Sequence, residues 1–120
     1  MRGASSSNQL RYHLGYHYPR STKTLNEVQK SNKDFLDFYG NNIFGNTKNY
    51  YGVAQRGSKT SYKNYIKFLE KNHLPFKKIN LDELKNVEGS ISSTEENINI
   101  FKIRKIIVKK IEKNKNINLK

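Results

Sequence analysis

The sequence predicts a mostly α or small α+β protein with a compact helical centre, an extended basic amino-terminal arm and a carboxyl-terminal tail. Two observations favour this fold class. Helix-start signals precede segments whose apolar residues recur every three or four positions. In addition, Leu, Ile, Val and Phe make up only 30 of the 120 residues, so the chain has little material for a large core. We therefore expect a small folded centre whose basic extensions become ordered on a partner.

Composition divides the chain into three parts. Residues 1–20 contain three arginines, three consecutive serines and no acid, which is typical of a basic arm. Residues 21–112 are expected to form one small helical or α+β domain with a glycine-rich loop at 40–60. Residues 113–120 are expected to form a basic tail.

Two helices are predicted in the first two thirds of the chain. The first covers 24–39, where Thr24 and Glu27 fit a capping box and Gly40 suits the position just after the last turn. The second covers 61–72, where apolar residues fall at i, i+3, i+4 and i+7 and so form one stripe. The middle of the first segment, QKSNKD, is polar all round, so the first helix is expected to bury only its two ends.

The connection between these helices is expected to be made of turns. Residues 40–60 hold four of the seven glycines and several asparagines. Within this segment Ile43-Phe44 and Tyr50-Tyr51 could form the short strands of a hairpin. After the second helix, the segment 76–81 predicts a further strand.

The last third of the chain is expected to contain a polar loop and then a helix. The loop covers 89–97, and its end, Ser93 to Glu96, has the pattern of a capping box. In the segment 98–112 isoleucines recur every three to four residues, acids precede it and lysines end it, which favours a helix. The same density of isoleucine also suits a strand, so both alternatives stay open for 98–112.

The stretch GVAQRGSKTSYK, from Gly52 to Lys63, comes close to a phosphate-binding P-loop. A P-loop has a lysine directly after its last glycine, but here Ser58 follows Gly57 and Lys59 comes one position late. The residues before the loop are polar rather than a buried strand. The pattern therefore argues against a nucleotide site and favours a basic turn that touches backbone phosphate.

Charge gives the strongest functional signal. The formal net charge is +13, and no acid occurs between Asp37 and Glu70, where lysines and arginine alternate with tyrosines. Cations neutralise phosphates, glycines allow close approach, and tyrosines can stack on unpaired bases. The alternatives are that the helical tyrosines simply pack in the core and that an AT-rich genome supplies part of the lysine and asparagine excess. The residues predicted to bind nucleic acid are Arg2, Arg11, Arg20, Lys48, Tyr50, Tyr51, Arg56, Lys59, Lys63, Lys67, Lys109 and Lys110.

Other classes of site find little support in the sequence. There is no cysteine, and His13 and His17, although four residues apart, flank a glycine and lack a third ligand nearby. The acids fall at expected helix starts or on an exposed helix, so no catalytic dyad or triad forms. No apolar run approaches the roughly 18 residues that cross a bilayer. We therefore expect no enzyme activity, no cofactor, no metal, no small-molecule substrate and no membrane partner.

These features favour a non-catalytic structural protein that binds RNA. In composition the chain is similar to the small, lysine-rich proteins that coat ribosomal RNA. The Arg- and Ser-rich, acid-poor amino end is typical of organelle transit peptides, so a mitochondrial ribosome is the expected setting, with another organelle or the cytoplasm as alternatives. The expected partners are ribosomal or other structured RNA and neighbouring proteins of a large complex. The rival interpretation is a supernumerary, non-catalytic subunit of a mitochondrial membrane complex of the respiratory type.

Overall fold

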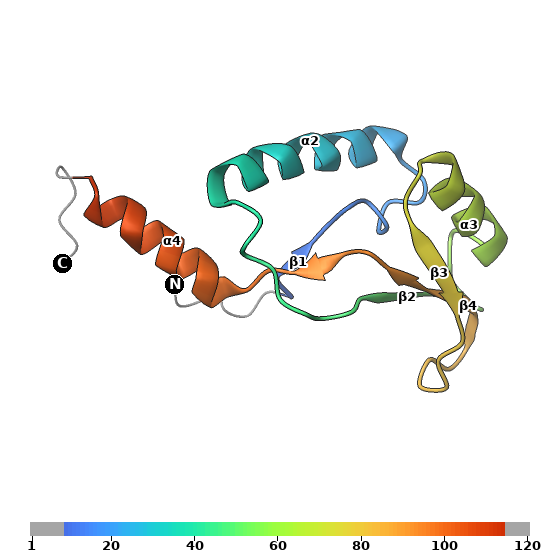
Figure 1. The fold of residues 1–120 in the computed structure, drawn as a ribbon. Helices are drawn as coiled ribbons and strands as arrows, with labels where there is room; N and C mark the ends of the chain where they lie inside the picture. Colours follow the sequence, from blue (N-terminus) through green and yellow to red (C-terminus); the bar gives the residue numbers. More distant parts are fainter. Residues whose placement is uncertain (1–8, 115–120) are drawn as a thin grey trace.

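The computed structural model describes residues 9–114, which fold into an α+β arrangement with three helices and five strands (Figure 1). The strands form a two-stranded sheet, in which β1 pairs with β5, and a three-stranded sheet in the order β2-β4-β3; every pairing is antiparallel. In chain order the elements are β1 (Arg11–Tyr12), α2 (Thr22–Tyr39), β2 (Tyr50–Ala54), α3 (Tyr62–Lys71), β3 (Phe76–Ile79), β4 (Val87–Ser93), β5 (Glu96–Asn97) and α4 (Ile100–Glu112).

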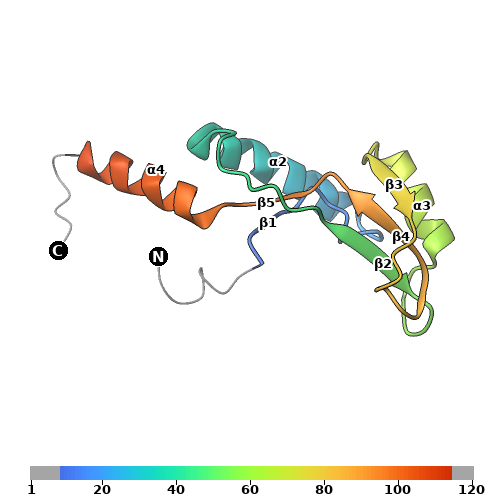
Figure 2. The same cartoon turned by 60° about the horizontal axis from the view of Figure 1, so that its bottom comes forward.

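Helix α3 covers one face of the three-stranded sheet. Its buried residues Tyr65, Ile66 and Leu69 join the same core as Ile91 of β4 and Val53 of β2. Both views place α3 alongside β3 and β4 (Figures 1 and 2). Successive strand residues point to opposite faces, so the row with Tyr51 and Ile91 faces α3 and the row with Tyr50, Ser92 and Lys77 faces the other way.

The segment before α2 is part of the core. Tyr16 is 1% exposed, and its ring stacks on Tyr51 with the centroids 5.6 Å apart. Its hydroxyl donates a hydrogen bond to the carbonyl of Pro75, and the Tyr65 hydroxyl donates to the Tyr16 carbonyl at 3.1 Å. Leu25, on the first turn of α2, is buried in the same cluster. The first turns of α2 are therefore attached to α3 and the sheet through these side chains.

Helix α4 extends away from this core, as both views show (Figures 1 and 2), and the molecule measures 55 × 30 × 23 Å. Asn99 caps its start by accepting from the amides of Phe101 and Lys102 at 3.1 and 3.2 Å. Ile103 is its one buried residue. Near its two ends, Lys102 Nζ donates to the Phe44 carbonyl at 3.0 Å and Lys110 Nζ donates to the Phe38 carbonyl at 2.8 Å. The helix is thus held by its first turns and by Lys110, whose Nζ also lies 3.5 Å from the centre of the Phe38 ring at the end of α2.

The predicted fold class, mostly helical with a compact helical centre, is wrong. The described chain is an α+β fold in which an antiparallel sheet forms the centre. The error arises at β4, which is the middle strand although the segment 89–97 reads as a polar loop. The hydroxyls of its serines can form hydrogen bonds inside the sheet. Ser90, for example, is 3% exposed, and its hydroxyl donates to the Ile79 carbonyl at 2.9 Å. A polar strand of this kind gives no alternating apolar signal.

Three smaller expectations also need correction. Residues 9–20 do not form an extended arm, because β1 pairs with β5 and Tyr16 enters the core. No hairpin joins Phe44 to Tyr50; Phe44 forms an isolated bridge with Ile98, and β2 pairs with β4 instead. The capping box at 93–96 is absent, since the last helix begins at Ile100.

Other predicted elements are found, with shifted ends. They are the helices at 24–39, 61–72 and 98–112 and the strand at 76–81. Residues 1–8 of the predicted arm and 115–120 of the predicted tail lie outside the described residues.

Candidate nucleic-acid interface

The loop that resembles a P-loop is a short turn between β2 and α3. Gly57 adopts a φ of 77°, a backbone conformation that favours glycine. Ser58 Oγ donates to the Thr60 carbonyl at 2.7 Å and accepts from the Thr60 amide at 3.3 Å, which closes the turn. Lys59 lies inside this turn, before the helix cap Ser61, rather than at the start of the helix. The geometry therefore differs from the phosphate cradle of a nucleotide-binding loop, as the sequence predicts.

This turn faces the segment before α2 across two adjoining hollows of about 410 and 350 Å³. Both hollows are lined by His17, Pro19, Ser58 and Thr60. The side chain of Arg56 lines the first hollow, and those of Arg20 and Lys59 line the second. We call this region the basic hollow, defined by His17, Arg20, Arg56, Ser58, Lys59 and Thr60.

The positive charge of the basic hollow comes from Arg20, Arg56 and Lys59, all of which are exposed. None of the described residues that line either hollow is an acid. His17 contributes no charge at neutral pH, because burial and then the neighbouring His13 and Arg11 lower its pKa below 6.5. The hydrogen bond from Arg11 Nη1 to His17 Nε2, at 3.1 Å, fits this state, since arginine can only donate and Nε2 must accept.

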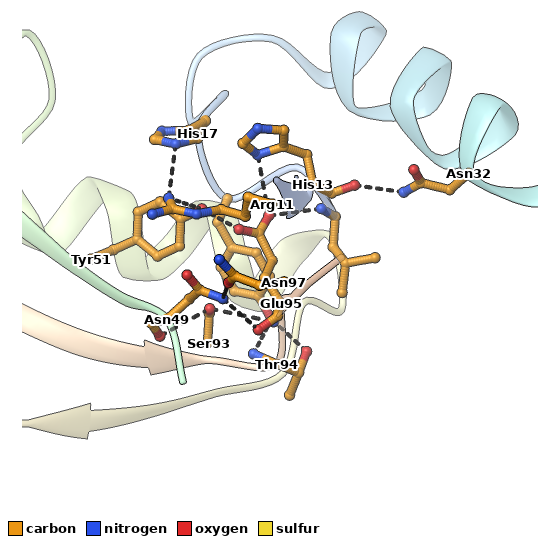
Figure 3. Close-up of polar contacts among 12 residues, drawn as sticks. Arg11, His13, His17, Asn32, Asn49, Tyr51, Ser93, Thr94, Glu95 and Asn97 are labelled. Atoms are coloured by element: carbon orange, nitrogen blue, oxygen red, sulfur yellow. Dashed lines mark hydrogen bonds and ion pairs between the residues drawn. The ribbon is translucent and has the colours of Figure 1, made fainter. Parts of the chain in front are cut away.

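A polar cluster lies beneath the basic hollow and joins three parts of the chain (Figure 3). The Tyr51 hydroxyl, from β2, donates to Oε2 of Glu95, which lies between β4 and β5. Arg11 Nη1, from β1, donates to the same hydroxyl at 3.2 Å, and its guanidinium lies 5.3 Å from the centre of the Tyr51 ring. Burial, and then the hydrogen bond to Glu95, raises the pKa of Tyr51 well above 10.0.

Glu95 is the buried acid of this cluster, with a side chain that is 0% exposed. Its Oε1 accepts from the Leu14 amide at 2.7 Å and lies 3.9 Å from His13 Nδ1. Its carbonyl accepts from Asn49 Nδ2 at 2.9 Å. A carboxylate closed off from solvent in this way cannot reach a substrate, so its contacts tie the amino-terminal segment to the sheet.

The twelve residues predicted to bind nucleic acid do not form one patch. Five of them gather at the basic hollow, three on its surface and two, Arg11 and Tyr51, in the cluster beneath. Lys48 and Tyr50 line a groove on the other side of the sheet. Of the rest, Lys63 and Lys67 are exposed on α3, Lys109 and Lys110 are exposed on α4, and Arg2 lies outside the described residues.

Two residues that shape these surfaces were missed. Glu95 reads as part of a capping box, and no sequence signal distinguishes a buried acid from one at a helix start. Lys77 lies in the predicted strand 76–81, next to Phe76, which packs against the core. The alternation of a strand could have placed Lys77 on the opposite face, and thus beside Tyr50.

The chain was compared with protein families, curated proteins and solved structures, and none of the three comparisons finds a match. Among residues 9–114, no helix combines the length and the apolar character needed to cross a bilayer. The rings of His13 and His17 lie 5.2 Å apart, but the described chain brings no group of three His, Cys or acidic residues together as metal ligands.

Proposed function

We propose that this protein is a non-catalytic RNA-binding component of a ribonucleoprotein and that the basic hollow binds backbone phosphate. The observation that supports this most directly is the convergence of Arg20, Arg56 and Lys59 around a concave surface whose described lining has no acid. Phosphate oxygens accept hydrogen bonds from guanidinium and ammonium groups, and from hydroxyls such as those of Ser58 and Thr60.

The distribution of charge supports a polyanionic partner. The formal net charge is +13. One of the ten acids, Glu95, is fully buried and hydrogen-bonded, so it offsets little of the positive charge at the surface. A surface whose electrostatic potential is mainly positive attracts nucleic acid over a long range and increases the rate of association.

A neighbouring protein is the second proposed partner, through α4. Phe101 is 72% exposed on the projecting helix. With Val108, three basic side chains and Glu112, it lines a shallow groove of about 440 Å³. An exposed aromatic side chain of this kind suits a protein–protein contact. Such a contact fits a protein of a mitochondrial ribosome, the setting that the composition favours. It fits a supernumerary subunit of a membrane complex equally well.

A salt series tests the RNA-binding proposal. We expect the affinity for a structured RNA to fall steeply as salt increases, and the double variant Arg56→Gln/Lys59→Gln to reduce the slope of log K against log salt by about 1–2. The matched control is Lys30→Gln/Lys33→Gln, which removes the same charge from the exposed side of α2. Equal effects of the two double variants on the slope would contradict the role of the basic hollow. An affinity that does not change with salt would contradict RNA binding itself.

Purification of the tagged protein from cells separates the two settings. Ribosomal RNA and ribosomal proteins in the purified material would support the ribonucleoprotein. Cofactor-bearing membrane subunits without RNA would support the rival and contradict the proposal.

A further inference from the structure

The face of the three-stranded sheet that α3 leaves uncovered carries a row of three side chains. Tyr50 of β2 and Lys77 of β3 both pair with Ser92 of the central strand β4. Residues opposite one another in neighbouring strands share a face, so these three side chains lie side by side. The next row, with Tyr51 and Ile91, points to the covered face, where Ile91 is fully buried. The sheet therefore separates two consecutive tyrosines, with Tyr51 inside and Tyr50 outside.

This row lies in a groove of about 620 Å³, the tyrosine groove, which we define by Lys48, Tyr50, Lys77, Ile79 and Ser92. Of the described residues that line it, the charged ones are Lys48 and Lys77, and both are positive. At the far end of β2 the same face is covered, because the side chains of Leu84 and Val87 lie over Gly52. The uncovered part of the sheet is thus limited to the end that holds Tyr50.

Tyr50 is available to a ligand in a way that the other tyrosine of this strand is not. The residue is 42% exposed, and its side chain makes no hydrogen bond or ring contact with the described residues. Tyr51, in contrast, donates to Glu95, stacks on Tyr16 and meets the edge of His17. An exposed aromatic ring on a sheet, in a groove that two lysines also line, has the features of a stacking platform for nucleic-acid bases.

We infer that the tyrosine groove binds an unpaired nucleotide of RNA, whose base stacks on the Tyr50 ring while Lys48 and Lys77 hold the flanking phosphates. This inference rests on the proposed function and makes it more specific, because it assigns single-stranded segments to this face. In a duplex the faces of the bases are already stacked on one another, so a ring on a flat sheet has no base to contact. The small side chain of Ser92 between Tyr50 and Lys77 leaves room for the sugar.

Binding assays with matched variants test the platform. The probe is a fluorescein-labelled oligouridine of about eight nucleotides, within the range of site sizes of known single-strand-binding domains. We expect Tyr50→Ala to weaken binding at least about fivefold, because loss of one stacked base is worth a factor of that size or more. Tyr50→Phe keeps the ring and should bind like the natural protein. Phe101→Ala removes another exposed ring, far away on α4, and should have no effect. Equal affinity of Tyr50→Ala and the natural protein would overturn the inference.

A fluorescence experiment reads the same site directly and does not depend on affinity. The chain has no tryptophan, so Tyr50→Trp introduces a single indole at the platform. We expect oligouridine to quench its emission and a blunt RNA duplex to leave it unchanged. Phe101→Trp is the control and should respond to neither. If RNA binds with strong salt dependence but leaves the emission of Tyr50→Trp unchanged, the groove is excluded while the proposed function stands. If no RNA binds at all, both fail.

Discussion

Tyr51 and Glu95 are joined by a hydrogen bond in the interior, donated by the Tyr51 hydroxyl to Oε2 of a carboxylate that no solvent reaches. The bond connects β2 to the link between β4 and β5. Since Oε1 of the same carboxylate accepts from the Leu14 amide, Glu95 also holds the segment that carries Tyr16 into the core. One acid therefore fixes the position of the basic hollow relative to the sheet.

Removal of the Glu95 carboxylate should destabilise the protein strongly. Glu95→Ala leaves the half-buried Tyr51 hydroxyl and Leu14 amide without this acceptor, and each such group costs about 1–3 kcal/mol. We expect the free energy of unfolding to fall by about 3 kcal/mol, measured by urea denaturation followed by circular dichroism. Glu95→Gln keeps an acceptor oxygen and should lose less.

The neighbouring acid provides the control. Glu96 is exposed and lies in β5, so Glu96→Ala should change the free energy of unfolding by about 0.5 kcal/mol or less. Equal losses for the two alanine variants would contradict the role assigned to Glu95.

Buried tyrosines should limit stability at alkaline pH. Burial raises the pKa of Tyr51 and of Tyr65 above the ordinary value of 10.0. Between 10.0 and the folded-state pKa, the unfolded chain loses these protons and the folded chain keeps them. The free energy of unfolding should therefore be unaffected by these groups below pH 10 and fall as pH rises above it. The rise in tyrosinate absorbance should stay incomplete until circular dichroism is lost, because Tyr51 and Tyr65 contribute to it only on unfolding.

A pair of phenylalanine variants isolates this effect. Tyr51→Phe should make the alkaline decline shallower, and at neutral pH it should cost about 1–2 kcal/mol because Glu95 loses a donor. Tyr50→Phe changes an exposed ring on the same strand and should alter neither quantity. An alkaline decline that is the same in both variants would show that other groups control it.

Close packing at Gly89 leaves no room for a side chain. A Cβ added there would lie 2.6–2.8 Å from three carbons of the Tyr62 ring, which bears on β4. We expect Gly89→Ala to lower the free energy of unfolding by about 1–3 kcal/mol through overpacking, measured by thermal and urea denaturation.

Gly57 distinguishes crowding from backbone strain. Its φ is positive but a Cβ there would meet nothing within 4 Å, so Gly57→Asn should be tolerated, with a cost of about 0.5 kcal/mol. A smaller loss for Gly89→Ala than for Gly57→Asn would contradict the packing argument.

The helices could be predicted from the sequence because their signals are local. Apolar spacing places α3, and its cap Ser61 accepts from the Asn64 amide within one turn. The cap of α2 is Ser21 rather than the expected Thr24, whose amide and hydroxyl both bond to Ser21. Neighbouring residues that can all act as caps fix the position of a helix start only to within a turn.

The sheet could not be predicted in the same way, because its stability comes from contacts distant in sequence. Asn49 holds the end of β4 in position, because its carbonyl accepts hydrogen bonds from both the amide and the hydroxyl of Ser93. Likewise Tyr16 reads as part of an irregular arm until Pro75 and Tyr65 are brought beside it. The cations of the basic hollow were predicted one by one from charge, but their convergence depends on this tertiary structure.

His17 should make RNA binding pH-dependent. It lines both parts of the basic hollow and is neutral at pH 7, since burial and nearby positive charge lower its pKa below 6.5. Protonation of His17 in the folded protein, which takes place below this lowered pKa, adds a fourth cation beside Arg20, Arg56 and Lys59. We therefore expect the affinity for RNA to rise as pH falls through the folded-state pKa of His17, by about twofold to fivefold once protonation is complete, the gain from one partly exposed charge pair. His17→Gln should remove this rise, whereas His73→Gln, after α3 and outside the hollow, should retain it.

Stability should fall over the same range of pH. Between pH 6.5 and the lowered folded-state pKa of His17, the unfolded chain binds a proton that the folded chain does not, so the free energy of unfolding falls as pH falls. Affinity measured at several pH values on folded protein, with the folded fraction checked by circular dichroism, separates the two effects. A rise of equal size in His17→Gln and the natural protein would exclude His17 as its source.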